Sequence, residues 1–280
     1  MNILYCGDRN IADGLMLSVL SLLKAVDGQL HIYVLTMGYS DENHTVQPLP
    51  QAVTDALDRR VKQHDPESFV LRLDISDLFA QHPPKANLDT RFTPCCMLRL
   101  YADLLPQLPD RLLYLDNDVI CRKDFREFYH QDMTGVELAG VPDYYGRWFF
   151  RRNLFRMDYL NSGVLLLNLP RIRQTGLFAK CRARCAETKM FMPDQSAINK
   201  LSLCKKQMPR RYNEQRRLHG DTVFQHFTTS FRFFPWFHAV SVKPWQTERM
   251  HSVLKLHEYD CLLAEFTAWK AELSQTAPPI

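Results

Sequence analysis

Asp116 and Asp118 are the two side chains whose type and spacing most clearly suggest chemistry. They directly follow the apolar segment 112–115, which is typical of a strand buried on both faces. In open α/β folds such strands end at the edge of the sheet where ligands bind. Two carboxylates there would offer oxygen ligands to a hard divalent cation, which could hold the phosphates of a nucleotide. The alternative is an ordinary strand-end turn, because Asp and Asn are common turn residues.

The acidic pair belongs to an alternating pattern of strands and helices. Strands are expected at residues 2–5, 31–36, 69–74, 112–115, 137–141, 163–169 and 222–227. Helices are expected at residues 13–25, 93–105, 170–188, from 193 onward and 248–272, with another that opens at 40–42 and restarts after Pro50. Strands alternating with helices predict an α/β fold with a mostly parallel central sheet.

Length and composition are those of an ordinary soluble globular protein, with 280 residues available for one large α/β domain or two small ones. The longest early apolar run, residues 14–23, is too short to cross a bilayer and lacks the flanks of a signal peptide. The eight cysteines are scattered without a Cys-x-x-Cys pair, so free thiols are expected rather than a structural zinc site. These features predict a cytoplasmic protein.

Charge is unevenly distributed along the chain. Residues 147–217 contain 17 Lys and Arg against four Asp and Glu, a net charge of +13, whereas the remainder carries −9. A basic half suggests an anionic partner, although part of the charge can lie on solvated helix faces. Nucleic acid is not expected, because none of the known recognition modules is present. Phosphorylated substrates or anionic membrane headgroups fit this charge.

Six short strings occur together in an order and spacing that resemble glycosyltransferase family 8, the group that includes glycogenin and bacterial lipopolysaccharide galactosyl- and glucosyltransferases. Each string is weak alone, and the resemblance runs from Met1 to about Trp245. The strings are YCGDRN at 5–10, MLRL at 97–100, LYLDND at 113–118, LNSGVLLLNL at 160–169, PDQ at 193–195 and VKPW at 242–245.

The resemblance implies a Rossmann-like glycosyltransferase A fold with a mostly parallel central sheet. Residues 1–247 would form the nucleotide-sugar-binding catalytic domain and residues 248–280 a C-terminal helical tail. Family members move a hexose from a UDP-sugar, use Mn²⁺ (with Mg²⁺ as the alternative) and retain the anomeric configuration. The implied acceptor is a glycan or lipid-linked glycan of the cell surface, with glucose or galactose as the sugar. Peripheral contact with the inner face of the membrane is the alternative to a fully cytoplasmic location.

The implied metal ligands are Asp116, Asp118 and a histidine shortly before the Lys-Pro-Trp string. His226 has the expected strand neighbourhood if residues 228–242 are an insertion, whereas His238 has the more usual spacing. We prefer His226 and keep His238 as the alternative. For the one not chosen, packing beside aromatic residues is the simpler explanation.

Further polar residues would bind the donor by resemblance. The loop after the first strand would contact uridine, with Asp8 accepting from the uracil imide and Asn10 approaching the ribose. The expected donor-binding residues are Cys6, Gly7, Asp8, Asn10, Arg99, Asn117, Asn161 and Lys243. Each has a simpler alternative. Residues 8–10 could be a polar loop before a helix, Arg99 a solvated helix side chain, and Lys243 a surface side chain before a Pro turn.

Asp194 and Gln195 are the expected catalytic residues, with Asp194 on the donor sugar and Gln195 near its anomeric carbon. Helix capping is the alternative role of Asp194. Gln195 is a poor nucleophile, so retention is expected through departure and attack on the same face, with a UDP oxygen as the base. Residues 143–156, rich in Tyr, Trp, Phe and Arg, are expected either to cover the acceptor or to form a hydrophobic flap.

The sequence is compatible with two other functions. In a phosphatase of the haloacid-dehalogenase type, Asp116 would be the nucleophile and Asp118 the general acid, with Gly220-Asp221 as the nearest candidate for the later acidic loop. A catalytically silent protein would bind a nucleotide sugar with a metal but neither transfer nor hydrolyse it.

Overall fold

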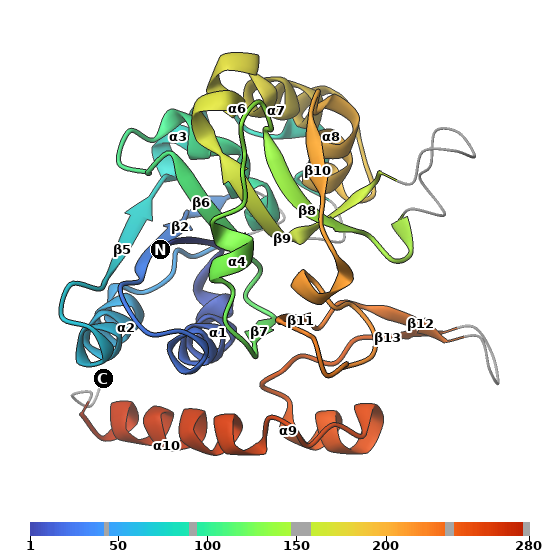
Figure 1. Cartoon of the computed structure of the whole chain (residues 1–280). Helices are drawn as coiled ribbons and strands as arrows, with labels where there is room; N and C mark the ends of the chain where they lie inside the picture. Colours follow the sequence, from blue (N-terminus) through green and yellow to red (C-terminus); the bar gives the residue numbers. More distant parts are fainter. Residues whose placement is uncertain (42–44, 90–93, 147–157, 233–237, 277–280) are drawn as a thin grey trace.

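A seven-stranded sheet positions the acidic pair at the carboxyl end of its central strand. The computed structural model describes residues 1–41, 45–89, 94–146, 158–232 and 238–276. Within these residues the strands stand in the order β10-β8-β9-β6-β1-β2-β5 (Figure 1). Their bounds are β1 Asn2–Cys6, β2 His31–Thr36, β5 Phe69–Asp74, β6 Arg111–Leu115, β8 Leu138–Pro142, β9 Leu160–Asn168 and β10 Lys205–Gln207.

Most neighbouring strands of this sheet are parallel. β1 lies parallel to β2 and β6, β2 to β5, and β8 to β10. β9 runs antiparallel to β6 and to β8. The predicted α/β fold with a mostly parallel central sheet is therefore confirmed.

Helices cover both faces of the sheet (Figure 1). One face packs against α1 Ala12–Ala25, α2 Gln51–His64, α4 Arg126–Tyr129 and α10 Asp260–Thr276. The other packs against α3 Ser76–Gln81, η3 Pro94–Leu104, α6 Leu169–Thr175, α7 Leu177–Glu187 and α8 Pro193–Leu201. The short helices are η1 Arg9–Ile11, η2 Lys85–Asn87, η4 Arg210–Tyr212, α9 Thr247–Arg249 and η5 Met250–Leu254.

Burial on both faces explains the unbroken apolar run before the acidic pair. Along β6, Leu113 and Leu115 pack in the core beneath α1, whereas Leu112 and Tyr114 pack in the core beneath η3. Because successive side chains of a strand point to opposite faces, both sets must be apolar when both faces are covered.

The described residues also form three small antiparallel sheets. β7 Val119–Cys121 pairs with β11 Phe224–His226. β12 Ser230–Arg232 pairs with β13 His238–Val240, and β3 Tyr39–Ser40 pairs with β4 Thr45–Val46. The β12–β13 hairpin falls inside residues 228–242, the segment interpreted above as an insertion.

The structure corrects several helix predictions. The helix expected to open at residues 40–42 is wrong, because Ser40 ends β3 and pairs with Thr45; the helix begins at Gln51. The single helix expected at 170–188 is two helices, because Gly176 adopts a left-handed φ of 66° that ends α6. The helix expected to start at Thr93-Pro94 and to run to Leu105 is a 3-10 helix from Pro94 to Leu104.

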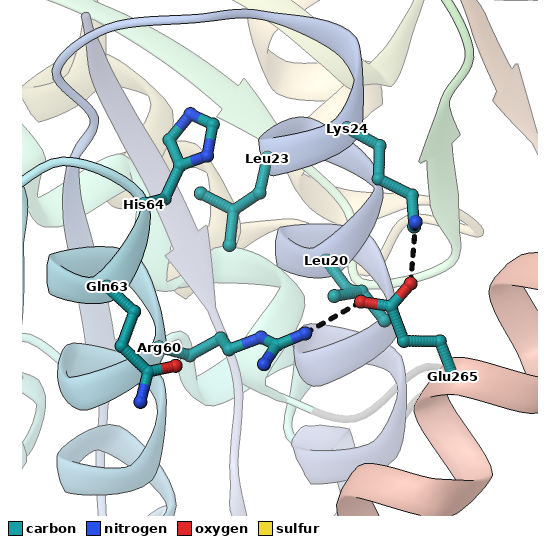
Figure 2. Close-up of a pocket in the computed structure, with 7 residues that line it drawn as sticks. All are labelled: Leu20, Leu23, Lys24, Arg60, Gln63, His64 and Glu265. Atoms are coloured by element: carbon teal, nitrogen blue, oxygen red, sulfur yellow. Dashed lines mark hydrogen bonds and ion pairs between the residues drawn. The ribbon is translucent and has the colours of Figure 1, made fainter.

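The C-terminal segment packs on the same core as the sheet. Leu263, Phe266 and Trp269 of α10 belong to the apolar cluster beneath α1 and α2. Figure 2 shows Glu265 pairing with Lys24 of α1 at 2.5 Å and with Arg60 of α2 at 2.7 Å. No helix within the described ranges combines the length and apolar character needed to cross a lipid bilayer.

Candidate active site

Two carboxylates and one imidazole meet where β6 and β11 end. Asp116 follows β6, Asp118 precedes β7, and His226 ends β11 opposite Val119 of β7. His226 Nε2 lies 3.2 Å from Asp118 Oδ1 and 3.5 Å from Asp116 Oδ2. One ligand atom from each of the three side chains lies within 4.8 Å of the others. The structure thus brings together the three residues expected as metal ligands.

Gly163 of β9 makes this approach possible. Its carbonyl accepts a hydrogen bond from the Asp116 backbone N–H at 2.8 Å. A Cβ at this position would lie 2.0 Å from His226 Cε1 and 2.7 Å from Asp116 Oδ2. Any larger residue would push apart the two side chains that face each other across it, so glycine is required here for close approach.

Cationic side chains stand beside each carboxylate. Arg99 Nη2 donates to Asp116 Oδ1 at 3.1 Å, and Tyr114 Oη donates to the same oxygen at 2.6 Å. Lys243 Nζ donates to Asp118 Oδ2. Burial alone would raise the pKa of Asp118, but the charges of Lys243 and His226 outweigh it and hold that pKa well below its usual range. Asp118 therefore stays ionised and available to a cation.

A chain of amides fixes the orientation of His226. The Gly163 backbone N–H donates to Asn161 Oδ1 at 3.0 Å, and Asn213 Nδ2 donates to the same oxygen at 2.9 Å. Asn213 Oδ1 must then face His226 Nδ1, 3.3 Å away, and an amide oxygen can only accept. Nδ1 consequently carries the proton in the neutral ring, and the Nε2 lone pair faces Asp116 and Asp118.

The donor set of this cluster fits a divalent cation. Two carboxylate oxygens suit Mn²⁺ or Mg²⁺, and one imidazole nitrogen favours Mn²⁺ of the two. Burial lowers the pKa of His226, but the negative charges of Asp118 and Asp116 outweigh it and raise that pKa above its ordinary value. These carboxylates would favour a cation for the same reason that they favour the proton.

A second buried polar group is built around Asp143. Its Oδ1 accepts from the backbone N–H groups of Tyr145 and Gly146 at 3.0 and 2.5 Å. Its Oδ2 accepts from Asn161 Nδ2 at 2.8 Å and from Gln195 Nε2 at 3.1 Å. Asp143 is thus fully hydrogen-bonded, and it holds in place the two amides that the sequence indicated as sugar-binding and catalytic.

Gln195 connects this group to the cation-binding cluster. Its Oε1 accepts from the backbone N–H of Ser162 at 2.9 Å and from the Ser162 hydroxyl at 3.1 Å. The Ser162 carbonyl in turn accepts from Arg99 Nη1. Segment 161–163 of β9 therefore contacts both groups, and the two share one wall of the site.

Asp194 is a buried carboxylate with one oxygen lacking a donor. Its Oδ2 lies 3.3 Å from Arg99 Nε, yet within the described residues it accepts no hydrogen bond. Arg99 Nε donates instead to the carbonyl of Cys96 at 3.0 Å. Burial raises the pKa of Asp194 above its ordinary value, against the opposing charge of Arg99. A hydroxyl of a bound ligand would satisfy this oxygen.

The loop after β1 forms a preorganised polar surface. Both Asp8 oxygens accept from Asn10, one from its backbone N–H at 2.9 Å and one from its side chain at 3.0 Å. A Cβ on Gly7 would lie 2.4 Å from Ile11 Cγ2, so the loop packs closely there. Burial raises the pKa of the Cys6 thiol, and the charge of Arg99 opposes this shift. Cys6 is accordingly kept neutral.

Asn117, between the two carboxylates, faces helix α1. A Cβ on Gly14 would lie 2.5 Å from the Asn117 carbonyl oxygen, 2.9 Å from its Nδ2 and 2.6 Å from Trp245. The structure thus joins the Asp116–Asp118 turn, the start of α1 and the Lys-Pro-Trp string, which lie far apart in the sequence.

Some of the expected site lies outside the described residues, and some of the site was not expected. Within the segment 143–156, residues 147–156 lie outside the described part. His238 belongs to β13, and its side chain is likewise outside it. Asn213 lay in none of the strings, Ser162 lay in the string at 160–169 without an assigned role, and Asp143 was noted only as the start of the aromatic segment. Their partners are distant in the chain, so no spacing rule could have found them.

Comparisons with known proteins agree on one family. The sequence model of Glycosyl transferase family 8 matches residues 2–249. The lipopolysaccharide 1,2-glucosyltransferase of Escherichia coli K12 is 26% identical over 212 residues, which cover 72% of this chain and 58% of that protein. A Haemophilus influenzae relative is 23% identical over 185 residues and is covered over 52% of its length. The chain thus spans about half the length of these curated relatives.

Solved structures share the fold over the whole chain. An active-site mutant of LgtC matches with a TM-score of 0.68 at 19% identity, covering 100% of this chain and 98% of that one. The galactosyltransferase LgtC in complex with donor and acceptor sugar analogs matches with a TM-score of 0.58 at 18% identity and the same coverage. The predicted glycosyltransferase A fold is confirmed.

These matches replace the phosphatase interpretation of Asp116 and Asp118. The acidic residue proposed for a second phosphatase loop, Asp221, pairs instead with Arg210 Nη2 at 2.8 Å.

Proposed function

The chain belongs to glycosyltransferase family 8, and from this premise we propose that it transfers a hexose, glucose or galactose, from a UDP-sugar to a glycan with retention of anomeric configuration. The observation that carries the proposal is the shared wall at segment 161–163. Arg99 from the carboxylate cluster and Gln195 from the Asp143 group both contact Ser162 there. A site for phosphates and a site for a sugar would therefore adjoin.

Asp116, Asp118 and His226 would hold Mn²⁺, with Mg²⁺ as the alternative. When bound, the cation would supply positive charge that stabilises the negative charge developing on the departing UDP. Arg99 and Lys243 would add to that charge, since each already contacts one of the carboxylates. Arg99 is 2% exposed and held by three acceptors, so its fork is oriented before the substrate arrives.

The remaining polar residues would orient the donor. Cys6, Gly7, Asp8 and Asn10 would bind uridine from the loop after β1, and Asn117 would contact the nucleotide from the carboxylate turn. Asn161 would lie along the donor sugar, with most of its hydrogen-bonding capacity already used within the protein. Such internal bonds lower the entropy cost of holding the site in shape.

Asp194 and Gln195 would act on the sugar itself. Asp194 Oδ2 lacks a donor, so it would accept from a hydroxyl of the donor sugar. Gln195 would lie near the anomeric carbon as a neutral amide. Asp143 is the carboxylate that accepts a hydrogen bond from Gln195. Its oxygens already accept four hydrogen bonds, which makes it a weak nucleophile. We therefore favour a mechanism in which UDP leaves and the acceptor hydroxyl attacks on the same face of the donor sugar. A UDP oxygen would take the proton of that hydroxyl.

The acceptor would be a cell-surface glycan, free or lipid-linked. The similarity to a lipopolysaccharide 1,2-glucosyltransferase and the basic stretch 147–217 support this choice. A cytoplasmic protein that touches the inner face of the membrane peripherally would meet such an acceptor. In this proposal residues 1–247 form the catalytic domain, and residues 248–280 form a tail that braces it.

The test is a screen of UDP-glucose, UDP-galactose and other UDP-sugars with Mn²⁺, followed by NMR of the released sugar at early times. We expect slow hydrolysis of one UDP-hexose, with the product first appearing in the anomeric configuration of the donor. The inverted anomer would overturn retention. Mn²⁺-dependent UDP binding with neither hydrolysis of any UDP-sugar nor transfer to a glycan acceptor would instead support the silent binding protein.

A further inference from the structure

A second cluster of potential ligands lies in the turn that leads into α10. His251 lies in η5, His257 follows it in the turn, and Asp260 is the first residue of α10. His251 Nε2 lies 2.6 Å from Asp260 Oδ1, and His257 Nδ1 lies 3.3 Å from Asp260 Oδ2. The two imidazole rings stack with centroids 4.2 Å apart and planes 23° from parallel. One ligand atom from each side chain lies within 4.8 Å of the others.

We propose that His251, His257 and Asp260 form a second metal site, which binds Zn²⁺ or a cation of similar softness such as Ni²⁺ or Co²⁺. Two imidazole nitrogens and one carboxylate oxygen are ligands typical of zinc. The same set lacks the second carboxylate that would suit Mn²⁺ or Mg²⁺. The side chains are 33%, 64% and 47% exposed, so a cation could enter from solvent and keep water in its remaining positions.

The stacking of the rings places one nitrogen of each beside the same carboxylate. Each of these nitrogens lies within hydrogen-bonding distance of one Asp260 oxygen. Release of the protons that form these bonds would leave two lone pairs beside one carboxylate. A divalent cation would satisfy these two lone pairs and the carboxylate charge at once.

The site would clamp the turn that attaches the tail to the catalytic domain. Lys255 in this turn adopts a left-handed φ of 56° and ends η5 between the two histidines. Tyr259, next to Asp260, donates a hydrogen bond from its hydroxyl to Gln225 Oε1 at 2.5 Å, one residue before His226. A cation closing residues 251–260 would therefore stiffen the contact that supports β11. The proposal does not depend on the transferase assignment.

The test counts bound Zn²⁺ on the full-length, EDTA-treated protein by equilibrium dialysis against ZnCl₂. The background is Asp116→Asn with Asp118→Asn, which removes two ligands of the buried cluster so that only the tail cluster is counted. We expect about one Zn²⁺ per chain in this background and at least about tenfold weaker binding after His257→Gln. The matched control is His130→Gln, an exposed histidine outside the cluster, which should leave binding unchanged.

Two further measurements keep the proposal falsifiable. Thermal unfolding of the background protein should move to higher temperature with Zn²⁺ and stay unchanged with Mn²⁺ or Mg²⁺. In the same background, imidazole NMR signals of His251 and His257 should both respond to one equivalent of a zinc salt. No bound Zn²⁺ in the background, or equal binding after His257→Gln, would overturn the site.

Discussion

Two clusters of histidine and aspartate, both within the described ranges, offer similar ligands in opposite surroundings. In the cluster of Asp116, Asp118 and His226, the side chains of Asp118 and His226 are 9% and 5% exposed. In the cluster of His251, His257 and Asp260, the side chains of His257 and Asp260 are 64% and 47% exposed. The buried cluster has two carboxylates and one imidazole, and the exposed cluster has the reverse.

The difference lies in how the ligands are held. In the buried cluster a further side chain orients each ligand: Arg99 and Tyr114 hold Asp116, Lys243 holds Asp118, and Asn213 holds His226. In the exposed cluster the three side chains contact chiefly one another. Preorganisation of this kind is what a catalytic centre requires, whereas a clamp tolerates looser geometry. Substitutions should therefore cost far more in the first cluster than in the second.

The largest expected effect is that of Asp118→Asn. Removing one carboxylate from the buried cluster should lower turnover roughly 10³-fold or more, because cation stabilisation of leaving-group charge amounts to several kcal/mol. Circular dichroism should show an unchanged fold. Asp260→Asn is the matched control in the exposed cluster, and its transfer rate should stay close to that of the unsubstituted protein. Equal losses in both variants would remove the distinction between the clusters.

Gly163→Ala should be the next most damaging change. The new Cβ would stand 2.0 Å from His226 Cε1, so His226 or Asp116 must move. We expect roughly a 10²-fold loss of activity and about 1–3 kcal/mol of destabilisation from overpacking. Gly220→Ala is the control, because a Cβ there meets nothing within 4 Å. Normal Mn²⁺ affinity in Gly163→Ala would show that the close approach is unimportant.

Asn213→Ala should weaken the buried cluster without removing a ligand. Loss of the acceptor for His226 Nδ1 frees the ring to turn, and such changes typically lower metal affinity about 10–100-fold. The transfer rate measured at low Mn²⁺ should fall and should recover as Mn²⁺ is raised. A defect that excess Mn²⁺ leaves uncorrected would place Asn213 in a role other than orienting His226.

Glu137→Gln tests a buried carboxylate that belongs to neither cluster. Glu137 Oε2 accepts from the Ser202 hydroxyl at 2.6 Å and from the backbone N–H of Leu203 at 2.7 Å. Burial would raise the pKa of Glu137, but these donors outweigh it and lower that pKa. Its stabilisation is thus present above the unfolded-state pKa and lost as pH falls through the folded-state pKa.

The expected result for Glu137→Gln is a loss of about 1–3 kcal/mol in the free energy of unfolding at neutral pH, which shrinks on acidification. Denaturant titrations at several pH values measure it. Mn²⁺ affinity should be unchanged. A fall in Mn²⁺ affinity would mean that buried carboxylates outside the cluster also set its strength.

Sequence patterns predicted the sheet and the acidic pair because both depend on neighbouring residues. An apolar run buried on two faces and followed by Asp116 and Asp118 can be recognised from the order of residues alone. The orientation of His226 is not, since it rests on Gly163, Asn161 and Asn213, which are brought together only by the folded sheet. The break between α6 and α7 was not predicted, because an isolated glycine such as Gly176 within a helical pattern does not by itself mark the end of a helix.

Cation binding at the acidic pair is measured most directly by a crystal structure of the protein with Mn²⁺ and UDP, recorded with anomalous scattering. We expect one Mn²⁺ peak bounded by Asp116, Asp118 and His226, with the diphosphate on the cation. A diphosphate bound elsewhere, with no Mn²⁺ between these three side chains, would contradict it.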